Sequence, residues 1–185
     1  MSDLFANSSI DQNLESPLAD RMRPQSLDEV IGQHHLLGEG APLQNMVSSG
    51  NFSSLILWGP PGVGKTTIAR LLADHSKSHF EQLSAIFTGV GDLKKVFETA
   101  KIRRTNGHKT IIFVDEIHRF NKSQQDSFLP FLEDGTITLI GATTENPSFE
   151  LNSAILSRVQ VLVLERLTNS NLENIFELSL IHISE

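Results

Sequence analysis

The sequence predicts an α/β fold built on a parallel sheet of five strands. Short apolar runs alternate along the chain with segments of helical periodicity. Apolar strands separated by helices are typical of a parallel sheet covered by helices on both faces. The expected strands are residues 55–58, 80–85, 110–114, 136–142 and 159–164. Ligands of such sheets bind at the carboxyl ends of the strands.

Helices are expected from apolar spacing and from local start and stop signals. Ser26, followed by Glu29, matches a capping box that could open a short helix. Another helix should follow Pro42 and end near Gly50. The remaining helices are expected at 67–73, about 91–104, near 123–132, near 151–157 and from Asn169 or Ser170.

Composition limits the classes of function. A length of 185 residues fits one large domain, or a domain with tails, and a hydrophobic fraction of 39% suffices for a core. The chain has no cysteine, which excludes disulfides and thiolate zinc sites, and its seven histidines show no convincing metal-ligand spacing. No secretion signal or membrane-spanning run is recognised, so we expect a cytoplasmic protein with no membrane association. The net charge of −7 argues against a surface that coats nucleic acid, although a local basic patch remains possible.

A phosphate-binding loop is the strongest motif. Residues 59–66 fit the pattern G-x-x-x-x-G-K-[ST] at every required position, between the first strand and a helix. Glycines let backbone N–H groups face phosphates, and the helix end favours an anion. Lys65 would reach the β- and γ-phosphates of ATP, and the Thr66 hydroxyl would bind Mg²⁺. The predicted nucleotide-binding residues are Gly59, Pro60, Pro61, Gly62, Val63, Gly64, Lys65, Thr66 and Thr67.

Two acidic residues follow the strand at 110–114, about 50 residues after the phosphate loop. Asp115 would hold Mg²⁺, through water, because Mg²⁺ keeps much of its hydration shell. Glu116 would act as the general base that polarises the attacking water. Adjacent carboxylates of this kind favour hydrolysis over phosphoryl transfer to a small acceptor.

The residues by themselves do not decide the role of the stretch 141–146 or of Arg158. A polar side chain in the stretch 141–146 could orient the attacking water or touch the γ-phosphate, or could simply end a strand. Arg158 precedes the last strand, where an ordinary surface ion pair is the expected role of a single arginine.

Together these motifs resemble the AAA+ ATPases, whose core is a P-loop NTPase fold. Five stretches narrow the resemblance to the replication-associated recombination protein A family, also called MgsA, and its eukaryotic relatives, the Werner-helicase-interacting ATPases. The stretches are 17–24, 31–36, 113–126, 133–138 and 141–152. The stretch 113–126 is the most specific, and its segment 118–122, His-Arg-Phe-Asn-Lys, points to this family together with the segment 144–149. The match covers about residues 17–176.

The resemblance implies further site residues. Thr144 would be the sensor-1 residue, with Thr143 the close competitor. Arg158 would be an arginine finger that enters the site of a neighbouring subunit, which requires a homo-oligomer. An adenine pocket would use backbone groups and apolar contacts, although the same segment could be a simple strap over the sheet. The residues of this pocket would be Arg23, Pro24, Ile31 and Gly32.

The resemblance also implies Mg²⁺-dependent ATP hydrolysis on DNA in replication-fork maintenance, recombination and repair, with single-strand-binding protein as a partner. A clamp-loader-like or scaffold subunit, and a protein-remodelling chaperone, are the alternatives. A branch-migration motor shares the Gly-Ala-Thr-Thr element but gives no reason for residues 118–121.

The segment 87–91 could grip a strand in a ring pore, or could be a packed turn. A cluster of basic residues could attract phosphate, although a solvated helix face is the commoner role; they are Lys94, Lys95, Lys101, Arg103, Arg104 and Lys109.

The resemblance also sets the expected domain organisation. We expect a flexible tail at 1–16, an ATPase core at 17–168, and the start of a lid helix with an atypical tail at 169–185. The family's helical lid and C-terminal oligomerisation region are expected to be absent. Because residues 177–185 do not resemble the family, we expect a truncated reading frame whose product binds nucleotide but hydrolyses it weakly.

Overall fold

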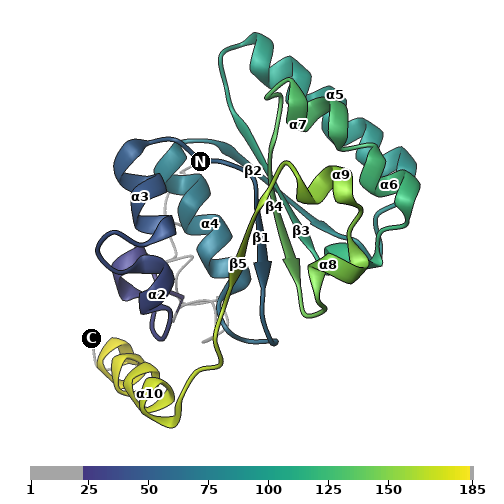
Figure 1. Ribbon diagram of the computed structural model, residues 1–185. Helices are drawn as coiled ribbons and strands as arrows, with labels where there is room; N and C mark the ends of the chain where they lie inside the picture. The colour runs from purple at the N-terminus through teal and green to yellow at the C-terminus, as the bar shows by residue number, and fades with distance from the viewer. Residues whose placement is uncertain (1–22, 184–185) are drawn as a thin grey trace, which may run out of the picture.

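A five-stranded parallel sheet lies between two layers of helices in the computed structural model (Figure 1). The strand order is β2-β3-β4-β1-β5, which confirms the predicted fold class. The structure describes residues 23–183, with side chains as far as Glu177. The predicted tail at 1–16, the first residues of the expected core at 17–22 and the end of the chain at 184–185 lie outside the described residues.

All five expected strands are present, with boundaries shifted by no more than two residues. The strands are β1 (Leu55–Trp58), β2 (His79–Ser84), β3 (Thr110–Asp115), β4 (Thr138–Thr143) and β5 (Gln160–Val163). The helices of the first half are η1 (Leu27–Glu29), α2 (His34–Leu37), α3 (Pro42–Ser49), α4 (Lys65–Ser76) and α5 (Val90–Thr105). Those of the second half are η2 (Ile117–Arg119), α6 (Lys122–Asp126), α7 (Leu129–Glu133), α8 (Pro147–Glu150), α9 (Ser153–Leu156) and α10 (Asn169–Ile183).

The core has two parts, one on each face of the sheet. Leu55 and Leu57 of β1 point to the layer of α2, α3 and α4, whereas Ile56 between them points to the layer of α5 to α9. Successive side chains of a strand face opposite sides of the sheet, so this apolar strand supplies both cores. The central strands β3 and β4 are buried in the same way, which holds their carboxyl ends rigidly.

One of the helix predictions is wrong, and another is confirmed with shorter bounds. The single helix expected near 123–132 is divided into α6 and α7 because Pro130, in the first turn of α7, has no N–H to continue the helical ladder. The helix expected near 151–157 is the short α9, which begins only after Asn152, whose side chain accepts a hydrogen bond from the Ile155 N–H at 2.8 Å.

The predicted capping box at the start of the described chain is also wrong. Ser26 precedes the three-residue helix η1, but its side chain makes no capping hydrogen bond. Instead, the Glu29 carboxylate accepts a hydrogen bond from the backbone N–H of Gln25 at 2.8 Å. The carboxylate thus reaches one residue further back than the pattern predicts.

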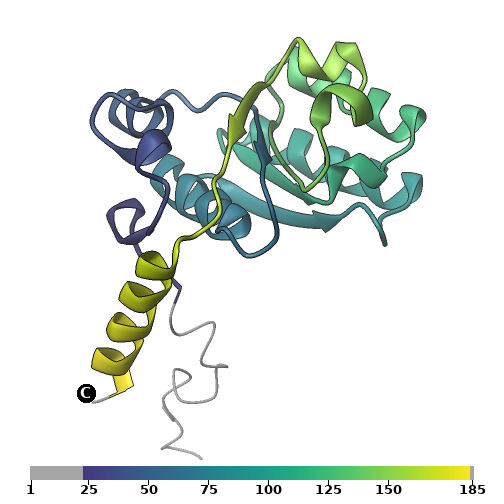
Figure 2. The same ribbon diagram turned by 60° about the horizontal axis from the view of Figure 1, so that its bottom comes forward.

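The last helix, α10, projects away from the body of the molecule (Figures 1 and 2). It begins at Asn169, as expected from the sequence. Within the described part of the chain, no helix combines the length and the apolar character needed to cross a membrane.

Candidate nucleotide-binding and hydrolysis site

Three of the four predicted catalytic residues, Lys65, Glu116 and Thr144, follow neighbouring parallel strands at the same edge of the sheet, and Arg158 does not. β4 lies between β3 and β1, and all three strands have their carboxyl ends at the same edge of the sheet (Figure 1). The phosphate loop follows β1, Asp115 ends β3, and Thr143 ends β4. The Gly59 N–H donates a hydrogen bond to the Thr143 carbonyl oxygen at 3.1 Å, which joins the phosphate loop directly to the end of β4.

The phosphate loop adopts a conformation that needs its glycines. Gly62 and Gly64 have φ values of 77° and 99°, in the left-handed region that favours glycine. A Cβ atom on either residue would point into open space, so this side of the loop is accessible to a ligand. Gly59 is required for a different reason, because a Cβ atom there would lie 2.7 Å from the Leu164 carbonyl oxygen beyond β5.

Helix α4 directs its free N–H groups towards the same region. Its first helical hydrogen bond runs from the Ile68 N–H to the Gly64 carbonyl at 2.9 Å. The N–H groups of Lys65, Thr66 and Thr67 precede that bond and therefore have no partner within the helix. Such a helix N-terminus can bind an anionic group.

Lys65 lies over the phosphate loop and is mostly buried. Its side-chain ammonium donates hydrogen bonds to the carbonyl oxygens of Gly59 and Pro60, both at 2.7 Å. Burial lowers the pKa of Lys65, and the nearby charges of Glu116 and Asp115 oppose that shift. The lysine and the two carboxylates thus interact electrostatically at this edge of the sheet.

Glu116 stands in an unusual backbone conformation. Its φ and ψ are 54° and 44°, which is uncommon for a residue with a side chain. The Asp115 carboxylate accepts a hydrogen bond from the Glu116 N–H at 3.1 Å. Backbone strain of about 1–3 kcal/mol of this kind is concentrated at functional sites. The bend turns the chain out of β3 and into η2.

His118 is a site residue that the sequence analysis missed. Its Nε2 lies 3.2 Å from Glu116 Oε2, and its Nδ1 lies 2.9 Å from the hydroxyl oxygen of Thr143. The Thr143 hydroxyl also contacts the backbone N–H and carbonyl oxygen of Glu145, at 3.0 and 3.1 Å. The only signal in the sequence is that His118 belongs to the stretch that is most specific for the family.

The two candidates for the sensor-1 role have different environments. Thr143 is fully buried, and its hydroxyl is engaged by His118 and by the turn after β4. Thr144 lies just beyond the strand and is half-buried. The assignment of the sensor-1 role to Thr144 stays a prediction. It is favoured because the Thr143 hydroxyl already has hydrogen-bond partners within the chain.

Arg158 lies far from the phosphate loop of its own chain. It precedes β5, whose first residue pairs with the segment before β1, so it stands at the amino edge of the sheet. Its guanidinium donates to the Ala154 carbonyl at 2.7 Å and forms an ion pair with Glu133 at the end of α7. The ion pair proposed from the sequence therefore exists, and it does not exclude a role towards a second subunit.

The comparisons with known proteins agree with this geometry. Residues 55–167 match the family model described as "ATPase family associated with various cellular activities (AAA)". The chain belongs to this AAA family. It is 53% identical over 173 residues to replication-associated recombination protein A of Escherichia coli K12, which is 92% of this chain and 39% of that protein. This chain therefore spans about two fifths of that relative's length.

Two further comparisons extend the relationship. The chain is 49% identical over 165 residues to the ATPase WRNIP1 of Dictyostelium discoideum, covering 89% of this chain and 19% of that protein. Among solved structures, the Thermotoga maritima RuvB Holliday junction branch migration motor matches with a TM-score of 0.72 and 31% identity. That match covers 87% of this chain and 55% of the RuvB chain.

In this AAA core, a buried glutamine holds the N-terminal segment against the nucleotide site. The Gln33 side chain donates to the Glu165 carbonyl at 2.8 Å and accepts from the Glu165 N–H at 3.0 Å. Its amide nitrogen is also 3.5 Å from the Val63 carbonyl of the phosphate loop. Gln33 was not singled out from the sequence, because both of these partners are distant along the chain.

The predicted adenine-pocket residues lie in this N-terminal segment. Gly32, which has a φ of 86°, packs so closely on the segment before α10 that a Cβ atom would meet Leu167 at 2.6 Å. Ile31 and Gly32 directly precede Gln33, whose side-chain amide nitrogen is the atom 3.5 Å from the Val63 carbonyl of the phosphate loop. Arg23 and Pro24 are at the start of the described chain, the former exposed and the latter half-buried. Their assignment to an adenine pocket stays a prediction.

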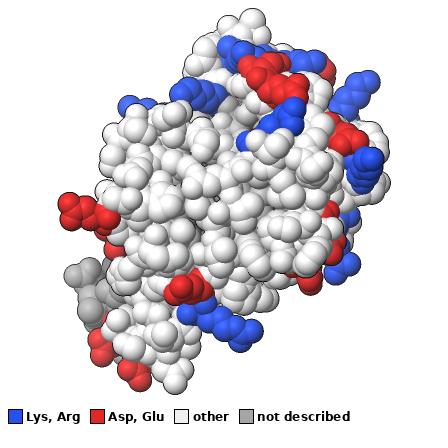
Figure 3. Space-filling model, viewed as in Figure 1, with Lys and Arg blue, Asp and Glu red and all other residues white. Residues whose placement is uncertain are grey.

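Three of the six residues of the basic cluster, all on α5, form local ion pairs. Lys101 pairs with Glu98 at 3.0 Å, Arg103 with Glu81 at 2.6 Å, and Arg104 with Asp134 at 3.4 Å. Figure 3 shows acidic and basic side chains side by side over α5 and α7. This arrangement favours the solvated helix face over a phosphate-binding surface.

The segment 87–91 carries an exposed aromatic ring. Phe87 is 85% exposed, and Ile86 and Val90 beside it are also exposed. The ring is therefore not packed within a turn, which leaves the pore-loop interpretation of this segment as a prediction.

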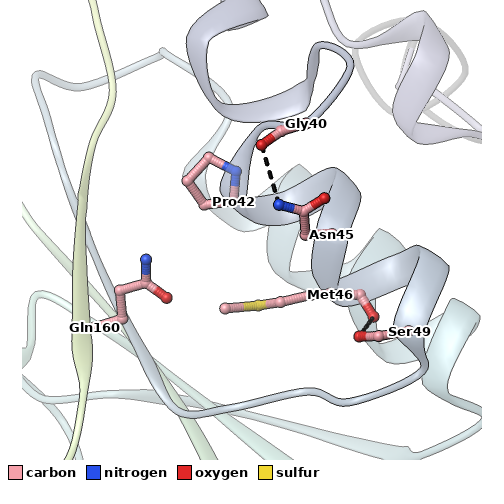
Figure 4. A pocket seen from close by; sticks show the side chains of 6 residues that line it. All are labelled: Gly40, Pro42, Asn45, Met46, Ser49 and Gln160. Atoms are coloured by element: carbon pink, nitrogen blue, oxygen red, sulfur yellow. Dashed lines mark hydrogen bonds between the residues drawn. The ribbon is translucent and has the colours of Figure 1, made fainter.

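One cavity on the described surface is unrelated to the predicted chemistry. It has a volume of about 380 Å³ and lies between α3 and the start of β5, where Met46 points towards Gln160 (Figure 4). The residues that line it are Gly40, Pro42, Asn45, Met46, Ser49 and Gln160. None of these side chains is charged, and the cavity is at the amino edge of the sheet, so it is distinct from the phosphate loop.

Proposed function

We propose that this chain is the core of an ATPase that hydrolyses ATP with Mg²⁺ and acts on DNA in replication-fork maintenance, recombination and repair. The observation that carries the proposal is the meeting of the phosphate loop, Lys65, Asp115 and Glu116 at one edge of the sheet. The names of the relatives, which include a recombination protein and a Holliday junction motor, support DNA as the site of action.

The residues present fit a magnesium–nucleotide complex. The loop side of Gly62 and Gly64 is open, and the first N–H groups of α4 are available to phosphate oxygens. Among the described residues, no group of three or more His, Asp or Glu side chains could hold a metal alone. Thr66 and Asp115 would supply oxygen ligands, and this small set suits Mg²⁺, which takes its other ligands from water and phosphate.

The chain's own groups have distinct tasks in the proposed reaction. The bound complex supplies the phosphoanhydride and the metal charge that assists its cleavage. Lys65 would exchange its two carbonyl hydrogen bonds for phosphate oxygens, which is possible because the flexible ammonium carries three donors. Glu116 would accept a proton from the attacking water, and Thr144 would orient the reacting groups.

Arg158 is proposed to act on the site of a neighbouring subunit. Its place at the amino edge of the sheet prevents it from reaching its own phosphate loop, whereas a second copy could receive it. The active form would then be a homo-oligomer. The predictions of a single-strand-binding protein partner and of a cytoplasmic location rest on the family resemblance alone.

The test is steady-state ATP hydrolysis with and without gapped or forked DNA. Glu116→Gln serves as the blank, and Glu39→Gln, an exposed carboxylate outside the site, is the matched control. We expect turnover that DNA stimulates and that only the first variant abolishes. Turnover indifferent to DNA would favour a loader-like or protein-remodelling role, and turnover no higher than that of a protein-free blank would refute the ATPase proposal.

A further inference from the structure

We propose that His118 is a positioning residue that holds the Glu116 carboxylate in place and connects it to the end of β4. The functional consequence of this inference rests on the proposed ATP hydrolysis, but the contacts of His118 with Glu116 and Thr143 can be tested separately. His118 would not touch the nucleotide; it would act through Glu116.

The contacts leave one carboxylate oxygen available for chemistry. His118 Nε2 approaches Oε2 of Glu116 at 3.2 Å, so the other oxygen, Oε1, can face the attacking water. The His118 side chain is only 8% exposed, and a buried polar group is expected to use its hydrogen-bonding atoms. Its second nitrogen does so with Thr143 at 2.9 Å.

The placement of His118 is fixed by packing as well as by its hydrogen bond with Thr143. It belongs to η2, whose neighbouring residue Ile117 is fully buried against β4. At Gly141 of β4, an added Cβ atom would lie 2.9 Å from the Ile117 side chain, so only glycine allows this close approach. The ring of His118 therefore has little freedom to leave its two partners.

The positions of the hydrogen atoms couple the contact of His118 with Glu116 to its contact with Thr143. A carboxylate only accepts hydrogen bonds, so a hydrogen bond across the 3.2 Å contact with Glu116 requires the hydrogen to be on His118 Nε2. If Nδ1 then accepts, the single hydroxyl hydrogen of Thr143 points at His118 and is withdrawn from the Glu145 carbonyl, the other acceptor at 3.1 Å. The orientation of the Thr143 hydroxyl and the hydrogen on the His118 ring are thus set together.

This chain of contacts joins the phosphate loop to the general base. Thr143 accepts a hydrogen bond from Gly59 through its carbonyl, and its hydroxyl contacts His118, which contacts Glu116. Thr144, the predicted sensor, is the next residue in the same turn. A movement of the turn at 143–145 would therefore displace the Glu116 carboxylate, and a misplacement of about 1 Å can cost about 10²-fold in rate.

The functional test compares three substitutions of His118 in the full chain. Asparagine places an amide near the Nδ1 position, whereas glutamine places one near Nε2, where it can still donate to Glu116. We expect His118→Ala and His118→Asn to lower kcat by about 10²-fold with ATP affinity unchanged. We expect His118→Gln to recover most of the loss. A merely structural role would make the three variants alike and would lower ATP affinity and thermal stability with kcat.

A second measurement needs no turnover. Ring-nitrogen NMR of histidine-labelled, nucleotide-free chain would locate the hydrogen on His118, with the signal assigned by its loss in His118→Gln. We expect the hydrogen on Nε2, a shift of that resonance in Glu116→Gln, and a shift of Nδ1 in Thr143→Val. The proposal would be overturned if the hydrogen were confined to Nδ1. It would also be overturned if the ring-nitrogen shifts of His118 were unchanged in both Glu116→Gln and Thr143→Val.

The failures of the two proposals are distinguishable. If the wild-type chain hydrolyses ATP no faster than a protein-free blank, the proposed ATPase function fails, whatever the NMR shows for His118. If the wild type is active and His118→Ala is equally active, the positioning role fails and the ATPase proposal stands.

Discussion

Removing the Gln33 side chain should measurably loosen the link between the body of the protein and the segment that leads into α10. Gln33→Ala deletes two hydrogen bonds with the Glu165 backbone, at 2.8 and 3.0 Å, from a side chain that is 1% exposed. At about 1 kcal/mol for each bond, we expect a loss of about 2 kcal/mol in the free energy of unfolding. For a protein of this size, that loss lowers Tm by about 4–8 °C.

The assay is thermal and urea unfolding followed by circular dichroism, beside the affinity for a fluorescent ATP analogue. Gln160→Ala, which truncates an exposed glutamine of β5, is the matched control and should change Tm little. Gln33→Glu should destabilise more than Gln33→Ala, because a buried carboxylate cannot donate to the Glu165 carbonyl and would face it as an acceptor. Equal stability of Gln33→Ala and Gln160→Ala, or a fully stable Gln33→Glu, would refute the reasoning.

Three other substitutions test the site. Glu116→Gln should retain ATP binding and lose turnover, because the amide cannot accept the proton of water; equal turnover would remove Glu116 from the base role. Arg158→Ala should bind ATP normally and hydrolyse it about 10³-fold more slowly, with partial rescue when mixed with Lys65→Ala subunits. The absence of any rescue in mixed oligomers would count against action on a neighbouring subunit. Gly141→Ala should destabilise by about 1–3 kcal/mol in urea titrations, because the added methyl overlaps Ile117 at 2.9 Å; an unchanged unfolding midpoint would show that η2 can yield.

The phosphate loop and the carboxylates after β3 could be predicted from the sequence because their signals are local. A strand, a glycine loop and a helix follow one another within a few residues, and the apolar run that precedes Asp115 and Glu116 is continuous. The structure places all three groups at one edge of the sheet, as the rule for parallel sheets predicts. The ligands and the reaction remain proposals, but the arrangement on which they depend is present.

Where local signals compete, sequence reasoning was less successful. Apolar periodicity over 123–132 favoured one helix, but Pro130 removes a backbone donor and divides it. At η1, the pattern predicted a capping serine, whereas the Glu29 carboxylate bonds to the backbone of Gln25. In both cases the competing interaction is visible in the sequence, and only the folded chain shows which one prevails.

The sequence by itself determined the succession of the five strands and the longer helices along the chain, the position of the phosphate loop and the identity of the two carboxylates, because period and motif are properties of neighbouring residues. The tertiary structure alone decided that His118 joins Glu116 to Thr143, 25 residues beyond the histidine, and that Gln33 bonds to Glu165, 132 residues away. These partners depend on strand order and on the close approach allowed at Gly141. No local pattern encodes such contacts, since they exist only after the sheet has brought distant segments together.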